Sequence, residues 1–272
     1  DYRLPDNILD NEIAMIEELG VEIKINTPIK DLASLFKQGY KAIFVATGAG
    51  ISQKMNIPGE DSKGVLHALD FLEQVNSGKK VDIGNNVAII GGGNAAVDAA
   101  RVACRLGASE VAIIYRRSRI EMPAIKSEID EAEKEEVKLN FLATPVKINA
   151  ENGQLKSIQC IRMELGEPDA SGRRRPIPIK GSEFDMLVDN IIIAISQTVD
   201  KTMLPKEIEY NGEGTLSVNP ITLQTNVKGV FAGGDLVFGP SDVISAIAAG
   251  KEAAISIDRH LNGVDLEEKR PF

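Results

Sequence analysis

The turn between one apolar run and the helix predicted after it constrains the fold of this 272-residue chain more than any other feature. Asn86–Ile90 is continuously apolar after its first residue, as is typical of a strand buried in a parallel sheet. Three glycines follow it directly, and residues 95–106 are predicted to form a helix. Residues 110–115 then supply a second strand. The segment predicts a βαβ unit and therefore an α/β fold.

The spacing within this turn is that of a dinucleotide site. Gly91 permits the tight turn, Gly93 lets the backbone approach a pyrophosphate, and the small Ala96 keeps the helix close to the strand. Free N–H groups at the helix N-terminus favour the anionic pyrophosphate. The alternative is a glycine turn that serves the fold alone. The residues expected to form the site are Gly91, Gly92, Gly93, Asn94, Ala95 and Ala96.

The end of the second strand indicates which dinucleotide binds. A site for NADH usually has Asp or Glu about 20 residues after the glycines, where the carboxylate holds the ribose 2′-hydroxyl. This chain has Arg116 and Arg117 instead, and guanidinium groups bind a 2′-phosphate through charge-assisted hydrogen bonds. We therefore expect NADPH. The alternative is that these arginines belong to a solvated loop.

Composition argues against several other classes of protein. A formal net charge of −9 disfavours binding to nucleic acid or to an anionic membrane surface. Cys104 and Cys160 lack CxxC spacing, and neither His67 nor His260 has clustered ligands near it in the sequence, so no metal site is predicted. The sequence has no leader pattern and no apolar run of about 18 residues. We expect a cytoplasmic protein.

The remaining chain continues the alternation of strands and helices. Further buried-type strands are predicted at 42–46, 190–195 and 230–232, and helices at 10–19, 32–37, 65–75 and 242–261. Residues 21–25 alternate apolar and polar side chains, as a strand does. Between residues 146 and 188, short strands separated by turns such as Asn152-Gly153 predict a β-meander insertion. Glu121, Glu128 and the acidic run 130–136 are expected on a solvated helix face.

Five segments occur in a characteristic order along essentially the whole chain. They are Tyr2-Arg3-Leu4-Pro5, Ala46-Thr47-Gly48, the glycine turn through Asp98, Tyr115-Arg116-Arg117 with Met122-Pro123-Ala124, and the segment 229–235. In these segments the chain resembles the small (beta) subunit of NADPH-dependent glutamate synthase and the related pyridine-nucleotide flavin oxidoreductases.

The resemblance implies two Rossmann-like domains of the pyridine-nucleotide disulfide oxidoreductase type. Residues 81–199 would bind NADPH, whereas residues 1–80, with the connecting helix, and 200–272 would form an incomplete FAD domain. Ser196 replaces the family's usual glycine, which puts a close backbone approach there in doubt. By resemblance, Ala194, Ile195 and Ser196 belong to the NADPH site, and Ala46, Thr47, Gly48, Gly234, Asp235, Asp242 and Val243 belong to the FAD site.

The resemblance also implies how electrons move. Hydride would pass from NADPH to FAD, and electrons would leave singly through iron–sulfur clusters to a large catalytic subunit or another acceptor. Because the cofactors carry this chemistry, no catalytic side chain is expected. The chain starts at Asp1, after the family's cysteine-rich segment and FAD-binding GxGxxG turn, so we expect a fragment that retains FAD weakly or not at all. The alternatives are a flavin subunit feeding a hydrogenase, a ferredoxin or a pyrimidine reductase, or a module that only binds nucleotide.

Overall fold

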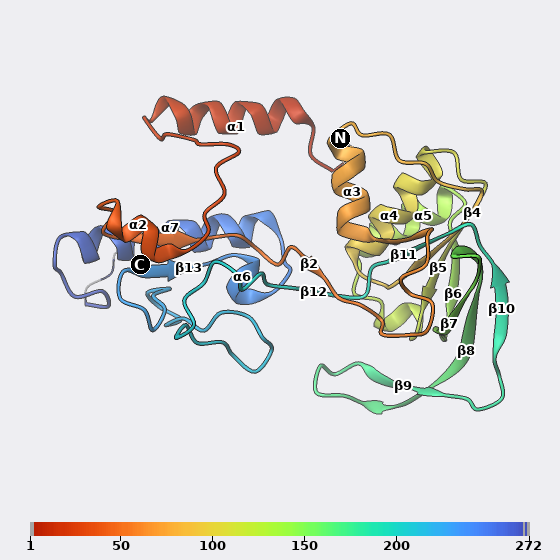
Figure 1. Ribbon diagram of the computed structural model, residues 1–272. Coiled ribbons are helices and arrows are strands. Elements are labelled where there is room, and N and C mark those ends of the chain that lie inside the picture. Colours follow the sequence, from red (N-terminus) through yellow and green to blue (C-terminus); the bar gives the residue numbers. More distant parts are fainter. Residues whose placement is uncertain (1–2, 269, 271–272) are drawn as a thin grey trace.

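The computed structural model describes residues 3–268 and residue 270, and its chain folds into two lobes (Figure 1). Tyr2, the first residue of the predicted Tyr2-Arg3-Leu4-Pro5 segment, lies outside the described residues. One lobe contains a five-stranded sheet with helices on one face. The other contains a small two-stranded sheet packed against helices.

The larger lobe is built on a parallel sheet whose strand order is β3-β11-β4-β5-β6. Its strands β11 and β4 are buried except at Asn86 because both faces of the sheet are covered, which is why their sequences are almost entirely apolar. The strands are β3 (Val65–His67), β11 (Asn190–Ile193), β4 (Asn86–Ile90), β5 (Glu110–Tyr115) and β6 (Lys138–Phe141).

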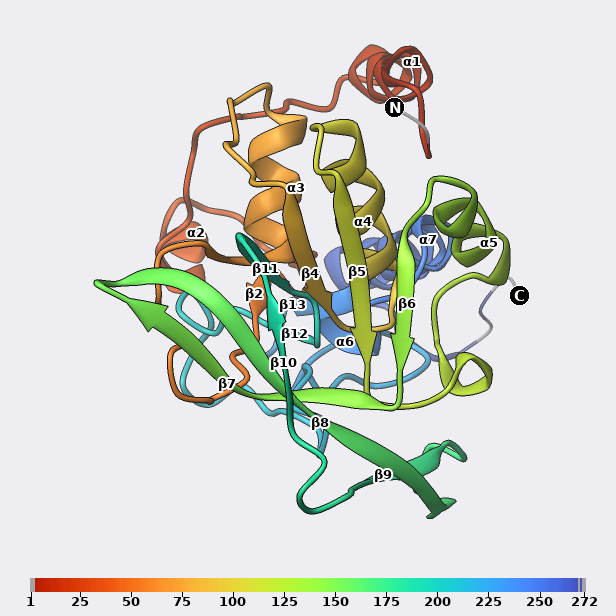
Figure 2. The same ribbon diagram turned by 90° about the vertical axis from the view of Figure 1, so that its right-hand side faces the viewer.

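Three helices cover one face of this sheet (Figure 2). The helix after the glycine turn buries Ala96, Ala99, Ala100 and Ala103 completely, so small side chains bring it close to the strands. The covering helices are α3 (Ala68–Asn76), α4 (Asn94–Arg105) and α5 (Lys126–Lys134), and a 3-10 turn, η1 (Arg119–Glu121), lies between β5 and α5. The predicted βαβ unit is therefore confirmed.

An antiparallel insertion covers the opposite face of the sheet and shares a core with it. Its strands are β7 (Ala143–Glu151), β8 (Gln154–Pro168), β9 (Arg174–Pro178) and β10 (Phe184–Leu187). The hairpin turn at Asn152-Gly153 is confirmed, with positive φ at both residues. The prediction of a meander needs correction, because β10 pairs with β8 rather than with β9. This is possible because β8 is fifteen residues long, so its far half pairs with β9 in an arm that projects from the lobe (Figures 1 and 2).

The smaller lobe centres on two parallel strands, β1 (Ile43–Val45) and β13 (Val230–Ala232). The helices α2 (Leu32–Lys37), α6 (Asp235–Phe238) and α7 (Val243–Leu261) belong to this lobe. Two short antiparallel strands, β2 (Ile51–Ser52) and β12 (Gln197–Thr198), carry the chain between the lobes. No helix among the described residues is long and apolar enough to cross a membrane.

Two predicted elements differ from the structure. Residues 65–75 do not form one helix, because Val65–His67 pairs with β11 as an edge strand before α3 begins. Both β3 and α3 pack on the larger sheet. Residues 21–25 form no strand, since they have no partner strand among the described residues. The helix before them, α1 (Asp6–Glu18), has no buried residue and stands clear of both lobes.

Candidate nucleotide site

The glycine turn after β4 is shaped by two contacts that exclude any side chain. Gly91 has a φ of +149°, and a Cβ there would lie 2.2 Å from the carbonyl oxygen of Ala194. A Cβ on Gly92 would lie 2.5 Å from the ring of Tyr115. These two glycines therefore let the turn pack against the ends of β11 and β5. Their role in the structure is close packing of the backbone.

Gly93 differs from its two neighbours, because a Cβ there would meet no protein atom within 4 Å. It is the N-cap of α4 in an extended conformation, and no side chain caps the helix. The first N–H groups of α4 therefore have no side-chain acceptor and adjoin open space. Ala96, one turn further on, is fully buried against the sheet. An open, uncapped helix N-terminus fits a pyrophosphate.

The loop after β5 is fastened to this turn by hydrogen bonds. The Asn94 side-chain oxygen accepts from Ile125 N at 3.0 Å, and Gly92 O accepts from Ala124 N at 3.1 Å. The hydroxyl of Tyr115 donates to Glu121 O at 2.8 Å. Asn94, predicted as a cofactor residue, thus has a structural partner. Glu121 was expected on a solvated face but is buried, because its carboxylate accepts from Ser118 in a capping box whose Ser-x-x-Glu spacing is visible in the sequence.

The two predicted arginines occupy different environments. Arg117 is 4% exposed, and its guanidinium donates to the Asp169 carboxylate at 2.6 Å and to Arg174 O at 2.7 Å. Its charge is therefore matched within the protein. Arg116 is exposed, and no carboxylate of the described chain lies within ion-pair distance of it. The part of the Arg116 side chain that is shielded from water, together with the neighbouring guanidinium of Arg117, lowers the pKa of Arg116 from its ordinary value.

The predicted segment after β11 lies beside the turn. Ala194 N donates to Ile90 O at 2.7 Å, so the ends of β11 and β4 are adjacent. Ile195 is exposed, and Ser196 accepts a backbone hydrogen bond from Gln53 N at 3.1 Å as the chain enters the crossing strands. The carboxyl ends of β4, β5 and β11 thus bring together the glycine turn, Arg116 and Ala194, at the edge where ligands bind in open parallel sheets.

The residues predicted for FAD gather at the carboxyl ends of β1 and β13. Ala46, Thr47 and Gly48 follow β1 and are at least partly exposed, and Gly233 N donates to Val45 O at 3.3 Å. Gly234 has a φ of +63° and begins α6, while the carboxylate of Asp235 accepts from Ser241 N at 3.2 Å. The structure therefore places five of these predicted residues on one side of the smaller lobe, in two neighbouring turns.

The start of α7 completes that group. The Asp242 carboxylate caps the helix by accepting from Ser245 N at 2.7 Å, and this hydrogen bond lowers the pKa of Asp242. Val243, Ile244 and Ile247 expose apolar side chains around the first two turns. The carboxylate already opposes part of the helix dipole there. This helix end therefore offers apolar surface more than positive potential.

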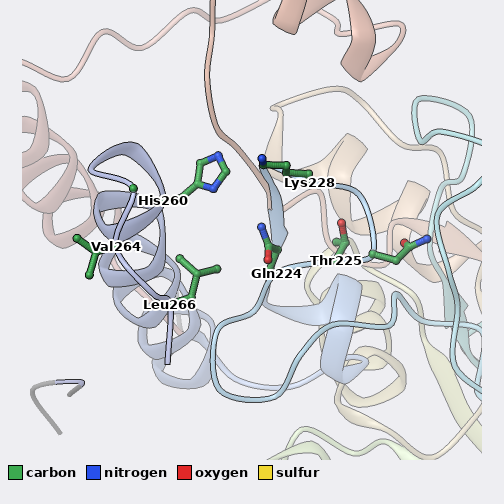
Figure 3. A pocket seen from close by; sticks show the side chains of 8 residues that line it. Gln224, Thr225, Lys228, His260, Val264 and Leu266 are labelled. Atoms are coloured by element: carbon green, nitrogen blue, oxygen red, sulfur yellow. The ribbon is translucent and has the colours of Figure 1, made fainter. Parts of the chain in front are cut away.

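A separate hollow of about 570 Å³ lies at the opposite end of α7 (Figure 3). Its lining includes Gln224, Lys228 and His260, together with Val264 and Leu266. Because Asp242 is at the other end of the same helix, this hollow is distinct from the predicted FAD residues. The residues that the structure describes contain no cluster of His, Cys, Asp and Glu able to hold a metal ion.

The chain is similar in sequence or in fold to several known proteins. The chain is 47% identical to the beta subunit of NADP(+)-dependent formate dehydrogenase from Moorella thermoacetica, over 96% of this chain and 38% of that protein. It is 32% identical to the glutamate synthase [NADPH] small chain of Azospirillum brasilense, over 94% of this chain and 56% of that protein. Mycobacterium tuberculosis FprA in complex with NADPH shares the fold, with a TM-score of 0.70 at 18% identity, over 88% of this chain and 68% of FprA.

These relatives refine the predicted family. The predicted resemblance to the glutamate synthase small chain is confirmed, but the sequence identity to the formate dehydrogenase subunit is higher. The comparisons therefore do not favour glutamate synthase over other members of the family. The chain spans about 40 to 60% of the length of these two relatives. The family model for pyridine nucleotide-disulphide oxidoreductases matches residues 7–250, and the chain belongs to that family.

Proposed function

We propose that this chain is the NADPH-binding part of a flavin oxidoreductase and exchanges reducing equivalents between NADP(H) and a flavin. One observation carries the proposal: Arg116, a cation without an ion-pair partner among the described residues, stands at the end of β5 in the same sheet edge as the open N-terminus of α4. An adenosine nucleotide with a pyrophosphate and a 2′-phosphate presents anions at this spacing in such folds.

The residues of the chain have separate tasks in this proposal. The N–H groups after Gly93 receive the pyrophosphate, and Arg116 binds the 2′-phosphate. The loop fastened through Asn94 holds Arg116 in place relative to the turn. Ala194 packs on Gly91 where the chain leaves for the second lobe, and we propose that the nicotinamide extends past it toward Ile195 and Ser196.

The two cofactors proposed for this chain, NADP(H) and FAD, are those that the family binds. We propose that Ala46, Thr47, Gly48, Gly234, Asp235 and the start of α7 from Asp242 and Val243 contribute to the flavin site, since their turns are open and adjacent. A bound flavin would supply hydride exchange with the nicotinamide and one-electron exchange with a further acceptor. The residues of the chain would bind and orient the two cofactors, and none is assigned acid–base chemistry.

A partner subunit completes the proposed system. Both relatives are named as subunits or chains of larger enzymes, one a formate dehydrogenase and one a glutamate synthase. We propose that the acceptor lies in an iron–sulfur protein or subunit, and the higher identity favours a partner of the formate dehydrogenase kind. Assay of the intact chain with candidate partners, following NADPH oxidation with each acceptor, tests this choice.

The nucleotide assignment is tested by equilibrium titration of NADPH and NADH into the chain. We expect NADPH to bind more tightly, and Arg116→Ala to weaken NADPH by about tenfold to a hundredfold while NADH is unaffected, because one charge-assisted contact is lost. Arg119→Ala is the matched control, since its guanidinium is already paired with Asp130 and Glu133. Equal weakening of both nucleotides by Arg116→Ala would contradict the assignment.

A further inference from the structure

The turn that joins β8 to β9 is held in one conformation by its own hydrogen bonds. The Asp169 carboxylate accepts from the backbone N–H of Ser171 at 2.9 Å and from its hydroxyl at 2.5 Å. Asp169 N donates to Arg173 O at 2.8 Å, and Gly172 N donates to Asp169 O at 2.9 Å. Arg173 Nε donates to the Ser171 hydroxyl at 3.0 Å. The turn therefore fixes the position of the Arg173 side chain.

This turn is also fastened to the end of β5, more than fifty residues earlier in the chain. Arg117 donates from Nη2 to the second carboxylate oxygen of Asp169 at 2.6 Å and from Nε to Arg174 O at 2.7 Å. The Arg117 side chain is 5% exposed, so these bonds are shielded from water. The tip of the insertion is thus anchored to the residue that follows Arg116.

Arg116 and Arg173 both lie near this anchor without a carboxylate of their own, whereas the guanidinium of Arg174 donates to the carbonyl oxygens of Leu165 and Gly166. Arg116 is exposed and Arg173 is half-buried, and neither forms an ion pair within the described residues. Arg173 uses only Nε in the turn, which leaves its terminal nitrogens available. Arg117 follows Arg116 directly and binds Asp169 and Arg174 O, on either side of Arg173 in the chain, so this turn lies beside Arg116; the charge of Arg173 also contributes to lowering the pKa of Arg116. Neighbouring cations with no matching anion are expected where an anion binds.

We propose that Arg173, delivered by the insertion, forms the second half of the 2′-phosphate site together with Arg116. The inference rests on the proposed NADPH function and extends it, because it makes the β8–β9 turn a determinant of cofactor choice. Two guanidinium groups match the two negative charges of a phosphate monoester near neutral pH. The buried Arg117 acts as a positioning residue, because it holds the turn and does not reach the phosphate itself.

The test compares two nucleotide fragments that differ only in the group concerned. The full chain is titrated calorimetrically with 2′,5′-ADP and with 5′-AMP. We expect Arg173→Ala to weaken 2′,5′-ADP by about tenfold or more and to leave 5′-AMP unchanged, with Arg173→Lys recovering part of the loss. Arg175→Ala is the matched control, since Arg175 is exposed, lies in the same arginine run and takes no part in the hydrogen bonds of the Asp169 turn.

The outcomes separate this inference from the function on which it rests. If Arg116→Ala weakens 2′,5′-ADP and Arg173→Ala does not, the role of Arg173 is overturned while NADPH binding stands. If the unmodified chain does not prefer 2′,5′-ADP to 5′-AMP, both fail. A loss for Arg173→Ala that Arg175→Ala reproduces also overturns the inference, because it would reflect general charge. Unchanged melting temperatures of the variants show that the loss arises in binding.

Discussion

Gly91 packs so closely on Ala194 that a Cβ at Gly91 would lie 2.2 Å from the Ala194 carbonyl oxygen. Its φ of +149° is also a conformation that residues with a Cβ avoid. We expect Gly91→Ala to lower the free energy of unfolding by about 3 kcal/mol or more, since strain and overpacking combine.

Urea denaturation followed by circular dichroism measures this loss. Gly107→Ala is the control, because Gly107 has a φ of +98° but a Cβ there would meet nothing within 4 Å. It should cost only about 1 to 2 kcal/mol. Equal costs at the two positions would show that the contact with Ala194 contributes nothing.

Gly93→Ala should leave the free energy of unfolding almost unchanged but weaken nucleotide binding. Its backbone φ of −89° suits alanine, and a Cβ would meet no protein atom, so the free energy of unfolding should change by less than about 0.5 kcal/mol. Binding of NADPH and NADH should weaken together, by about tenfold, because the methyl group enters the space proposed for their shared pyrophosphate. Titration of both nucleotides checks this, and unaltered affinity would place the pyrophosphate elsewhere.

The ion pairs of α4 predict a contrast between two arginines one turn apart. The Arg101 side chain is 8% exposed and binds Glu128 and Glu135, the latter at 2.8 Å, whereas Arg105 is 44% exposed. We expect Arg101→Met to destabilise the fold by about 3 kcal/mol, because it removes the buried cation that both carboxylates share and leaves Glu128 and Glu135 to the more exposed Arg3 and Arg105. Arg105→Ala should cost less than about 1 kcal/mol in the same denaturation experiment. Similar values for both would contradict the burial seen for Arg101.

Acid should release the turn at the tip of the insertion. Hydrogen bonds from Ser171, followed by the charge of Arg117, hold the pKa of Asp169 below its ordinary value of 3.8. The ionised carboxylate therefore stabilises the folded state fully above about pH 4, and this contribution disappears as the pH falls through the lowered pKa. Asp169→Asn should melt earlier than the unmodified chain at pH 7, and the difference should shrink below pH 4. A difference that does not shrink at all as the pH falls below 4 would assign the stabilisation to another group.

Sequence patterns correctly predicted those strands, turns and helices whose structure depends on a single contiguous segment of the chain. The strand, glycine turn and helix from Asn86 to Arg105 follow from apolar runs and glycine placement within about twenty residues. The edge strand Val65–His67 was missed, because its apolar residues also suit a helix and only its partner β11 decides between the two. Likewise, residues 21–25 alternate like a strand but have no neighbouring strand in the described chain.

The same limit applies to charged side chains. Arg116 and Arg117 are indistinguishable by sequence, yet one is exposed and the other is bonded to Asp169, 52 residues away. Glu128 was expected on a solvated face and instead binds the buried Arg101, 27 residues earlier. Charge patterns indicate that an anion site is present, but the partner of each cation depends on tertiary contacts.

The crossing strands β2 and β12 hold together the two points at which the chain passes between the lobes. Ser52 pairs with Gln197, so the chain leaves the smaller lobe and returns to it at the same point. Residues 53–196 therefore form a continuous segment whose two ends are neighbours, which is the arrangement that permits one domain to be inserted into a loop of another. A lobe attached in this way can be exchanged between proteins by two crossovers at these neighbouring ends, and one short turn in the host would close the gap that it leaves.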